Sequence, residues 1–441
     1  MSATKNKQHR SPRGMRDVLP EEAARWRGLE ELARRLALLR GFREIRPTLL
    51  EETELFVRSV GEVTDIVEKE MFTLQKGDTS LSLRPEGTAG IVRAYLQAGY
   101  AKTQPVQRLF HVGPMFRYER PQKGRERMFT QFDVEALGST DPRLDAEVIA
   151  LAVRFFQGLG FSAGSEGLVV RLNSMGDGED RDRFREALRA FIGPRLEEYC
   201  ELCRSRFERN VLRILDCKNP NCRELLAADG GAPSMLDEGI LSPENSAHLE
   251  TVEACLGGLG IAYERDRELV RGLDYYTRTV FEVHYPPLGA RSAVCGGGRY
   301  DHLIEDLGGP DLGAVGFAVG FTPTLLAMDE LGLSLEAEET KPEAFVVAAG
   351  TENGDALGRE VFLLAEELRL GGIAAVYDTE GKSVKAQMKL ANKGGYRFAV
   401  VLGDDELAQG TCQLKDMAAS EQREVERAQL VAAVREALAR S

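Results

Sequence analysis

The stretch MFRYERPQKGRERMFTQFDVEALG, residues 115–138, limits the fold more than any other part of the chain. Two runs with strand-like alternation flank a short basic loop, which is the pattern of a β-hairpin. Further strand-like runs lie at 72–74, 81–84 and 106–118, and helical segments are interspersed without regular β-α-β alternation. We therefore expect an antiparallel sheet flanked by helices, in an α+β domain.

The length and composition of the chain limit the kinds of protein it can be. At 441 residues, of which 43% are hydrophobic, it is long enough for two or three packed domains. No apolar run reaches the length of about 18 residues that a membrane span needs, and MSATKNKQHRSPRG at the N-terminus lacks the apolar segment of a secretory signal. The seven cysteines do not indicate a disulfide framework. We expect a cytoplasmic protein without a membrane span.

The charge excludes one class of protein and leaves another open. A formal net charge of −13 at pH 7 excludes a surface that is coated with phosphate-binding groups. Local basic segments remain, and each suits either a nucleic-acid contact or an ordinary solvated face. They include RYERPQKGRER and the lysines Lys382, Lys385, Lys389 and Lys393.

The character of the sequence changes along the chain. Residues 1–330 carry the sheet pattern, which is interrupted at about 177–255 by charged, cysteine-bearing helical sequence of the kind an insertion would have. A polar linker over 331–342 precedes a final piece, 343–441, in which strands and helices alternate. This alternation predicts a separate small α/β domain at the C-terminus.

Residues 316–326, GFAVGFTPTLL, predict a strand that leads into a helix. Large apolar residues alternate with small ones such as Gly316 and Gly320, which indicates a strand in a crowded interior. Thr322 suits the N-cap of the helix and Pro323 its first position. Such a junction often faces a ligand, although no charged residue stands here to hold one.

Two segments outside the hairpin carry residues suited to a site. Glu86 and Thr88 stand at a glycine turn before a predicted helix, where a carboxylate suits an ammonium group or, equally, a solvated helix N-terminus. In LVRGLDYYTRTVFEV, Arg271 and Asp274 precede two tyrosines in an apolar context. A buried arginine there requires an anionic partner, which is either a ligand or Asp274 itself.

The hairpin and a glycine-rich segment are further candidates. Arg117 and Glu119 share one side of the first hairpin strand, and arginine suits bidentate contacts to phosphate or carboxylate. The second strand carries polar residues on one side, namely Gln131, Asp133 and Glu135. A surface hairpin with alternating polar positions is the alternative. The glycines of CGGGRYD permit either the close approach of a ligand or a bend.

Four cysteines form a pattern of their own. Cys200 and Cys203 are spaced C-x2-C, Cys217 and Cys222 are spaced C-x4-C, and 13 residues separate the pairs. This arrangement suits a tetrahedral structural zinc site, although the second spacing is wider than usual. Unliganded reduced cysteines are the alternative.

Taken together and in this order, these segments resemble the bacterial histidyl-tRNA synthetases, which are class II aminoacyl-tRNA synthetases, from about Gly14 to the C-terminus. RGLDYY is a signature of that family, and FRYERPQKGR resembles its form of class II motif 2. The helix and Pro47 strand over 25–50 resemble motif 1, which builds a dimer interface in class II enzymes. KEMFTL and GDDEL also match family patterns.

The resemblance implies a fold and a reaction. The core would be a six- to seven-stranded antiparallel sheet flanked by helices, with a helical insertion that closes over tRNA and a C-terminal anticodon-binding domain. The enzyme would activate histidine with ATP and Mg²⁺ to histidyl-adenylate, then transfer the histidyl group to the 3′ end of tRNA(His). It would act as a homodimer.

The resemblance also implies a role for each matching residue. Arg117 and Arg271 would neutralise the charge that builds up on the α-phosphate, and Glu119 would help to bind ATP. Histidine would be bound by Glu86, Gly87, Thr88, Gln131, Glu135, Tyr275 and Tyr276. The acceptor end of tRNA would contact Arg120, Gln122 and Arg127.

Motif 3 departs from the family pattern. It usually reads G-F-A-x-G-x-E-R-L, and Pro323 stands here where the family has an arginine that holds the γ-phosphate of ATP. Proline has neither charge nor N–H donor, so it cannot replace that contact. The sequence therefore leaves open an active ligase in which another group compensates, and a non-catalytic, histidine-binding paralogue that resembles the regulatory subunit of ATP phosphoribosyltransferase. An RNA-binding paralogue is a third alternative.

Overall fold

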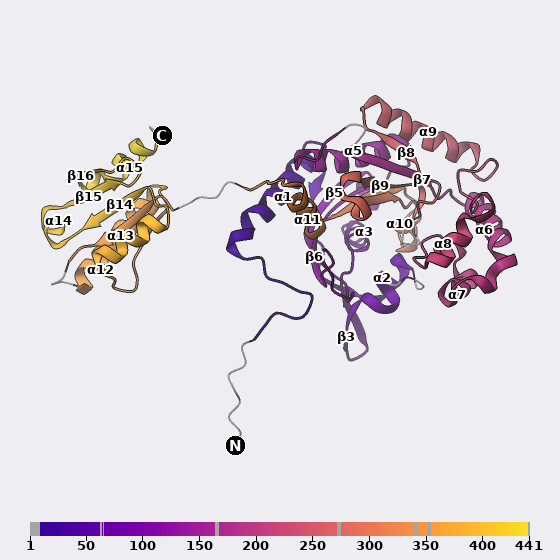
Figure 1. The fold of residues 1–441 in the computed structure, drawn as a ribbon, viewed down its shortest axis with the longest axis horizontal. Coiled ribbons are helices and arrows are strands. Elements are labelled where there is room, and N and C mark those ends of the chain that lie inside the picture. Colours follow the sequence, from indigo (N-terminus) through magenta and orange to yellow (C-terminus); the bar gives the residue numbers. More distant parts are fainter. Residues whose placement is uncertain are drawn as a thin grey trace, which may run out of the picture. The chain divides into compact units, whose positions relative to one another are not determined.

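The computed structural model describes residues 9–61, 64, 66–163, 167–270, 275–337, 342–350 and 354–439. The chain forms two compact units, Met1–Ala337 and Glu338–Ser441, and each is described by itself (Figure 1). Arg271 and Asp274, which belong to the predicted site, lie outside the described residues.

The first unit is built on an eight-stranded sheet with the order β1-β5-β6-β11-β10-β9-β7-β8. Neighbours from β5 to β7 are antiparallel, whereas the short outer strands β1 and β8 pair in parallel. The predicted antiparallel core is confirmed, and the two short edge strands bring the total above the implied six to seven. The bounds are β1 Arg43–Glu44, β5 Gln107–Phe116, β6 Met128–Leu137, β7 Val169–Ser174, β8 Tyr263–Arg265, β9 Thr277–His284, β10 Ala293–Arg299 and β11 Ala314–Gly320.

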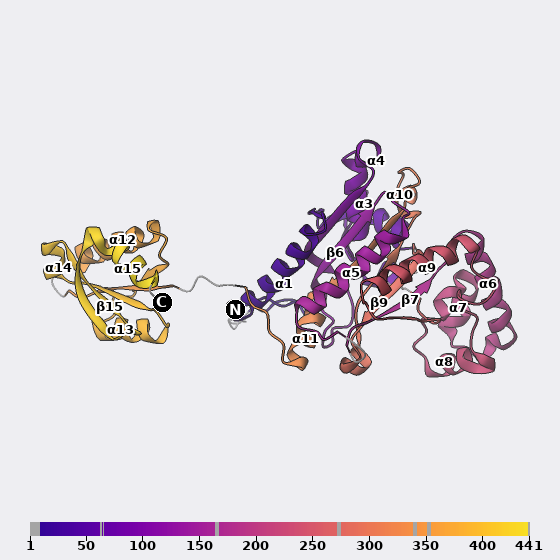
Figure 2. The same ribbon diagram turned by 90° about the horizontal axis from the view of Figure 1, so that it is seen from above.

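Helices cover both faces of this sheet (Figure 2). One face packs against α1 (Pro20–Leu38), α5 (Pro142–Gly158), α9 (Pro243–Gly258) and α11 (Phe321–Leu331). The other packs against α3 (Thr88–Gln97) and α10 (Leu303–Asp306), with the short α4 (Tyr100–Thr103) beside them. The side chains of Phe132 and Val134 of β6 enter the core on the face of α1, α5, α9 and α11, which we call the first core. The residues that alternate with them along β6 therefore face α3. No helix in the described part of the chain is long and apolar enough to cross a membrane.

The prediction of one strand around Pro47 is wrong in one respect, because the segment is divided between two sheets. Its first part is β1, and its second part, β2 (Leu50–Glu52), joins a separate three-stranded sheet of order β2-β4-β3. Pro47 lies in the break, where its carbonyl accepts a hydrogen bond from Arg84 Nη1 at 2.9 Å. The small sheet also contains β3 (Phe72–Lys76) and β4 (Thr79–Leu83), and α2 (Thr53–Val60) and the π-helical turn η1 (Ile66–Glu70) lie between β2 and β3 along the chain.

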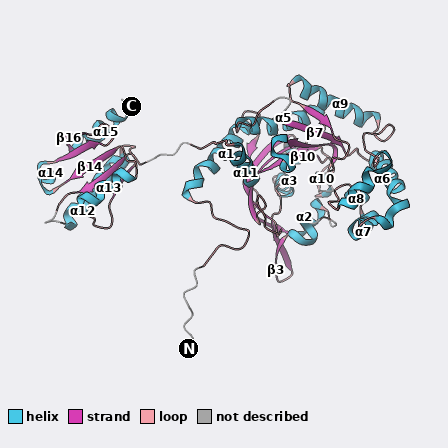
Figure 3. Cartoon of the chain, viewed as in Figure 1, coloured by secondary structure: helices cyan, strands magenta, loops and turns pink. Residues whose placement is uncertain are grey.

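A group of short helices lies at one end of the first unit (Figures 1 and 3). Its elements are α6 (Glu179–Ile192), α7 (Glu201–Arg209) and α8 (Pro220–Ala227), with 3₁₀ turns η2 (Gly193–Glu198), η3 (Val211–Ile214) and η4 (Ala228–Gly230). We call residues 179–230 the helical insertion. The longer helix α9 follows it and returns to the main sheet, where Val252 and Leu256 join the first core.

The start of α11 differs from its prediction. The helix begins at Phe321 with Gly320 as N-cap, so Thr322 and Pro323 already lie in its first turn. Pro323 fits there because the first N–H groups of a helix have no partner within the helix. Thr322 does not cap the helix, since its hydroxyl donates instead to Glu126 Oε2 at 2.8 Å.

The second unit is a five-stranded sheet of order β13-β12-β14-β15-β16 with helices around it. The predicted alternation is confirmed over β12 (Ala344–Ala348), α12 (Gly354–Leu370), β13 (Ala375–Tyr377), α13 (Val384–Lys393), β14 (Phe398–Leu402), β15 (Thr411–Asp416) and α15 (Leu430–Ala439). Two elements were not predicted, namely α14 (Asp404–Gln409) and β16 (Glu421–Glu426). Only Val425 of β16 is buried, so this edge strand has no apolar alternation to detect.

Candidate active site

The floor of the candidate site is the face of β6 that carries Gln131, Asp133 and Glu135. Asp133 and Glu135 are each 1% exposed, and Glu135 pairs with Gly316 on the neighbouring strand β11. A Cβ atom on Gly316 would lie 1.9 Å from Glu135 Oε2. The prediction that this strand, β11, runs through a crowded interior is therefore explained by the Glu135 carboxylate. Because Gly316 has no side chain, it leaves the space that this carboxylate fills.

Glu86 lies at the start of α3 and closes one side of the site. Its carboxylate accepts hydrogen bonds from the backbone N–H groups of Thr88 at 2.8 Å and Ala89 at 2.9 Å. It is only 5% exposed, so it is not the solvated helix N-terminus of the alternative interpretation. Next to it, Gly87 leaves room for Asp133, because a Cβ there would come within 2.5 Å of Asp133 Oδ2.

Two hydroxyl groups hold Glu135 in place. The Thr88 hydroxyl donates to Oε1 at 2.6 Å, and the buried Tyr300 hydroxyl donates to Oε2. Tyr300 was not assigned to the site from the sequence, although it follows the three glycines of CGGGRYD, which were noted as a place of close approach. Those glycines lie in β10, two strands from β6. The fold therefore brings together a side chain and a carboxylate that lie 165 positions apart.

Two buried acceptors of the site have no partner. Gln131 Oε1 and Asp133 Oδ2 make no hydrogen bond with any residue that the structure describes. An unpaired buried acceptor is costly, and most such groups in folded proteins find a donor. The two residues are two positions apart in β6, so their side chains lie on the same face of the sheet. These two acceptors are thus suited to a ligand that brings several N–H donors.

The site also gathers buried carboxyl groups whose ionised forms burial and mutual repulsion disfavour. Burial raises the pKa of Glu86, and it raises the pKa of Asp133 and Glu135 well above their usual range. The charge of Glu86 raises the pKa values of Asp133 and Glu135 further, while Arg84 and Arg117 oppose the increase at Asp133. A cationic ligand would stabilise the ionised carboxylates, since an opposite charge favours the charged form.

We expect Asp133→Asn to stabilise the ligand-free protein, by an amount that grows with pH. A carboxyl whose pKa is raised on folding contributes most stability when protonated, and this contribution is lost as the pH rises through the raised pKa. The asparagine variant has no charge to bury, so its gain in melting temperature should increase between about pH 5 and about pH 8. Calorimetry at both pH values measures this gain, with the exposed Asp78→Asn as the control. A gain that is independent of pH would contradict the assignment.

Arg84 has a structural role beside the site. It is 2% exposed, and it donates to the carbonyls of Pro47 and Pro114, each at 2.9 Å, and to His111 Nε2 at 2.8 Å. His111 Nδ1 in turn donates to the carbonyl of Ile45 at 2.9 Å. Burial and the adjacent guanidinium lower the pKa of His111 to about 4, so its ring is neutral. Arg84 thereby ties the turn before Glu86 to strand β5.

Arg117 stands near the buried carboxylates. Its Nε donates to the carbonyl of Pro85 at 2.8 Å, and its guanidinium lies 5.4 Å from the ring centre of Phe129. Its charge lowers the pKa of both Glu86 and Asp133, which places it within electrostatic reach of the pocket. Glu119, two residues along, accepts from Arg125 at 3.3 Å instead.

A cluster of tyrosines forms another wall. The rings of Tyr275 and Tyr276 are 4.8 Å apart, those of Tyr275 and Tyr300 are 5.4 Å apart, and all three side chains are buried. Burial raises the pKa of Tyr275 well above its usual range, and the charges of Glu86 and Glu135 add to this. Tyr275 is therefore a neutral hydroxyl group next to the carboxylates. Arg271, predicted to stand with them, lies outside the described residues.

The tip of the β5–β6 hairpin is the most exposed part of the predicted site. Arg120 and Gln122 are exposed, and Gln122 bridges to Arg125 across the tip. Arg127 lies at the base, where its guanidinium is 3.8 Å from the ring centre of Tyr118 and its Nε donates to the carbonyl of Glu119. The structure thus leaves Arg120 and Gln122 open to a partner and uses Arg127 to brace the hairpin.

A pocket of about 350 Å³ separates the hairpin tip from the first turn of α11. Pro323 and Thr324 line one side, and Lys123 and Arg125 line the other. The glycine at the tip, Gly124, packs close to Leu326, because a Cβ there would lie 3.3 Å from Leu326 Cδ1. Cations of the hairpin therefore lie near the motif 3 position that lacks one.

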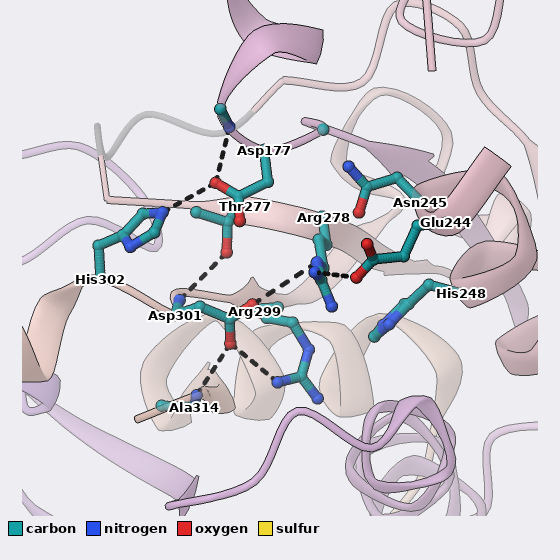
Figure 4. Close-up of polar contacts among 12 residues, drawn as sticks. Asp177, Glu244, Asn245, His248, Thr277, Arg278, Arg299, Asp301, His302 and Ala314 are labelled. Atoms are coloured by element: carbon teal, nitrogen blue, oxygen red, sulfur yellow. Dashed lines mark hydrogen bonds and ion pairs between the residues drawn. The ribbon is translucent and has the colours of Figure 1, made fainter. Parts of the chain in front are cut away.

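A network of charged residues surrounds Asp301, which follows Tyr300 in the chain (Figure 4). Asp301, next to Tyr300, accepts from Arg299 Nη1 at 2.9 Å and from the N–H of Ala314 at 3.1 Å, and its own N–H donates to Thr277. These contacts join the ends of β9, β10 and β11. The network continues through Arg278 to Glu244 on α9, at 2.9 Å. It fixes the backbone from which Tyr300 reaches Glu135.

The four cysteines of the C-x2-C and C-x4-C pairs lie in the helical insertion. Their Sγ atoms are within 4.8 Å of one another, so the fold brings the two pairs together.

Comparisons with known protein families agree with this arrangement. The family model described as Histidyl-tRNA synthetase matches residues 14–323, and the one described as Anticodon binding domain matches residues 344–437. The first match covers more than half of the chain, and together the two extend over both compact units.

Similar proteins cover nearly the whole chain. A "Histidine--tRNA ligase" of Desulforamulus reducens is 46% identical over 95% of this chain and 97% of its own length, and one of Moorella thermoacetica is 47% identical over 95% and 96%. The crystal structure of apo S. aureus histidyl-tRNA synthetase superposes with a TM-score of 0.78, at 36% identity, over 97% of this chain and 100% of that one. This chain belongs to the histidyl-tRNA synthetase family.

Proposed function

We propose that this chain activates histidine with ATP and transfers the histidyl group to the 3′ end of tRNA(His). The observation that supports this best is the cluster of buried carboxyl groups on β6 and just before α3, namely Glu86, Asp133 and Glu135, together with Gln131 Oε1 and Asp133 Oδ2, which have no partner among the described residues. Histidine brings an ammonium group and an imidazole, both of which carry N–H donors. These donors match the buried carboxyl groups and the unpaired acceptors.

The two ends of histidine are assigned to different parts of the pocket. The ammonium group is bound by Asp133 Oδ2 and Gln131 Oε1, which have no other partner among the described residues, with Glu86 beside them. The imidazole is recognised by Glu135 together with Tyr275 and Tyr276. Thr88 and Gly87 position these groups, the first by its bond to Glu135 and the second by leaving space for Asp133. Such hydrogen bonding rejects apolar amino acids strongly.

Arg117 acts on the reacting phosphate in this proposal. A carboxylate oxygen of histidine attacks the α-phosphorus of ATP, the bond from this phosphorus to its bridging oxygen breaks, and pyrophosphate leaves. Negative charge builds up on the α-phosphate, and a fixed guanidinium stabilises it. Nε of Arg117 is held by the carbonyl of Pro85, which directs the rest of the guanidinium. Arg271 is proposed to share this role, Glu119 to help bind ATP, and Mg²⁺ to accompany its phosphates.

Transfer to tRNA involves the hairpin tip and the second unit. A hydroxyl of the terminal ribose attacks the carbonyl of histidyl-adenylate, and AMP leaves. Arg120, Gln122 and Arg127 are proposed to position the acceptor end, and the second unit to bind the anticodon. The exposed Lys385, Lys389 and Lys393 on α13 suit its phosphates. A homodimer in the cytoplasm, with the motif 1 segment at its interface, is part of the same proposal.

Arg120→Ala should separate the two half-reactions. Because Arg120 is exposed at the hairpin tip, its loss should raise KM for tRNA(His) by about 5- to 50-fold while histidine-dependent ATP–pyrophosphate exchange changes less than about 2-fold. Aminoacylation and exchange assays on the same preparation measure both effects. Lys76→Ala, at the exposed end of β3, is the control for a general loss of positive charge. An equal loss in both assays would contradict a role limited to tRNA.

Pro323→Arg tests what motif 3 lacks in this chain. If an arginine can contact the γ-phosphate from the first turn of α11, kcat/KM for ATP in the exchange reaction should rise, by up to about 10-fold. The backbone nitrogen of residue 323 makes no hydrogen bond within the helix, because it lies in the first turn of α11, so the helix start tolerates the change. Pro323→Gln is the uncharged control. An unchanged or lower kcat/KM would indicate that Lys123 or Arg125 across the pocket already supplies the charge.

The regulatory-subunit alternative finds little support. The relatives named histidine--tRNA ligase align over 95% of the chain, and the anticodon-binding match extends over the second unit. Aminoacylation of tRNA(His) with labelled histidine tests the proposal. Charging of tRNA(His) and not of a tRNA for another amino acid is expected, whereas histidine binding without charging would support the regulator.

A further inference from the structure

The helical insertion brings its four cysteines to one point. Cys200 is the N-cap of α7 and Cys203 lies in its first turn. Cys217 follows η3, and Cys222 lies in the first turn of α8. All four are free thiols, and their Sγ atoms lie within 4.8 Å of one another.

The spacing of the sulfur atoms suits a metal rather than a disulfide. Cys200 Sγ and Cys217 Sγ are 3.9 Å apart. In a tetrahedral site with Zn–S bonds of about 2.3 Å, the sulfur atoms are about 3.8 Å from one another, whereas a disulfide brings them to about 2.05 Å. The first pair of cysteines lies at the start of α7, and Cys222 of the second pair lies at the start of α8.

Backbone groups around the cluster would stabilise thiolate ligands of a metal ion. The N–H of Cys200 donates to Cys222 Sγ at 3.3 Å, and such a bond stabilises a negatively charged sulfur. The N-terminal turns of both α7 and α8 carry cysteines of the cluster, and the positive end of a helix dipole favours negative charge. Cys203, Cys217 and Cys222 are buried, so water has little access to the sulfur atoms.

The cysteines connect the shorter elements of the insertion. α7 has 9 residues and α8 has 8, and the 3₁₀ turns η2 and η3 precede them along the chain. Apolar side chains of the same segments, among them Tyr199, Leu212 and Ile214, are buried beside the cysteines. Small segments of this kind are commonly held together by a structural metal or by disulfides.

We propose that Cys200, Cys203, Cys217 and Cys222 bind one Zn²⁺ ion that joins α7 to α8. Four protein ligands leave no open position, so the site is structural and not catalytic. Thiolates select zinc over Mg²⁺ or Ca²⁺, which prefer oxygen ligands. This site is independent of the proposed aminoacylation reaction, and its test does not require activity.

Metal analysis of the full-length protein, purified under reducing conditions from zinc-supplemented cells, tests the proposal. About one zinc per chain is expected in the wild type, and at least about tenfold less in Cys203→Ser. Cys255→Ser, which removes a thiol on α9 outside the cluster, should retain its zinc. Iron in place of zinc, less than about 0.1 zinc per folded chain, or full zinc content in Cys203→Ser would each overturn the proposal.

A second measurement covers the case in which Cys203→Ser does not fold. The wild-type protein is depleted of metal under reducing conditions and titrated with Co²⁺. Saturation at about one equivalent, with the sulfur-to-metal charge-transfer bands and strong visible absorption of a tetrahedral thiolate site, is expected. Displacement of these bands by Zn²⁺ confirms that both ions share the site. Weak absorption typical of octahedral Co²⁺ would overturn the proposal.

Discussion

Replacing Arg117 with alanine is expected to lower kcat/KM for histidine-dependent ATP–pyrophosphate exchange by about 10²–10³. The guanidinium is held at the pocket edge by its bond to Pro85 and by Phe129, so it is already in place when charge develops on the α-phosphate. A preorganised cation of this kind contributes mainly to the transition state, and kcat should therefore fall more than KM rises.

Arg108→Ala is the matched control for Arg117→Ala. Arg108 belongs to β5, which ends one residue before Arg117, but its two Nη atoms donate to Glu147 on α5, each at 2.8 Å, away from the buried carboxylates. Its loss should change exchange by less than about 3-fold. An Arg117→Ala protein that keeps more than about a third of wild-type exchange would contradict the role assigned to this residue.

Asp145→Asn is expected to cause the largest loss of stability, of about 3–5 kcal/mol in the free energy of unfolding. Asp145 and Arg299 are each 0% exposed; Asp145 accepts from Arg299 Nε at 3.1 Å and from His248 Nε2 at 2.7 Å. The variant would leave the buried guanidinium with Asp301 as its one carboxylate partner among the described residues. Urea unfolding, followed for the transition of the first unit, measures the loss.

The stability lost in Asp145→Asn should also depend on pH in the acidic range. Burial alone would raise the pKa of Asp145, but Arg299 and His248 outweigh it, and the net effect lowers the pKa. A carboxylate with a lowered pKa contributes stability above its unfolded pKa and loses it as the pH falls through the folded value. The difference between wild type and Asp145→Asn should therefore shrink below about pH 4.

Asp141→Asn is the control on the same helix. Asp141 is the N-cap of α5 and pairs with the exposed Arg143, which lowers its pKa to about 2. Asparagine also caps helices, and an exposed ion pair contributes little, so the loss should stay below about 1 kcal/mol. Equal losses for Asp141→Asn and Asp145→Asn would contradict the importance given to burial.

The sequence predicted much of this fold because its signals are local. The β5–β6 hairpin is encoded by two alternating runs and a basic turn, and the second unit by strands and helices that alternate along the chain. β16 and the division around Pro47 were not predicted, because an exposed edge strand has no apolar pattern and a proline does not indicate which sheet the next residues join.

The candidate site was predictable as residues but not as contacts. Glu86, Gln131 and Glu135 stand in segments that match the family, so the sequence indicated them. The hydrogen bond from Tyr300, just after β10, to Glu135 on β6 spans the intervening strand β11, and no local pattern encodes it. The unpaired state of Asp133 Oδ2 is likewise a property of packing, since it depends on which donors the fold brings near.

Histidine-dependent ATP–pyrophosphate exchange by the wild-type protein tests the central claim most directly. Because the buried acceptors are matched to an ammonium group and an imidazole, exchange should require histidine, and leucine or phenylalanine should support it at least about 10³-fold less well. This result would also establish that Pro323 does not abolish activation. Binding of histidine in calorimetry without any exchange above background would contradict the claim that the pocket is the active site of a ligase.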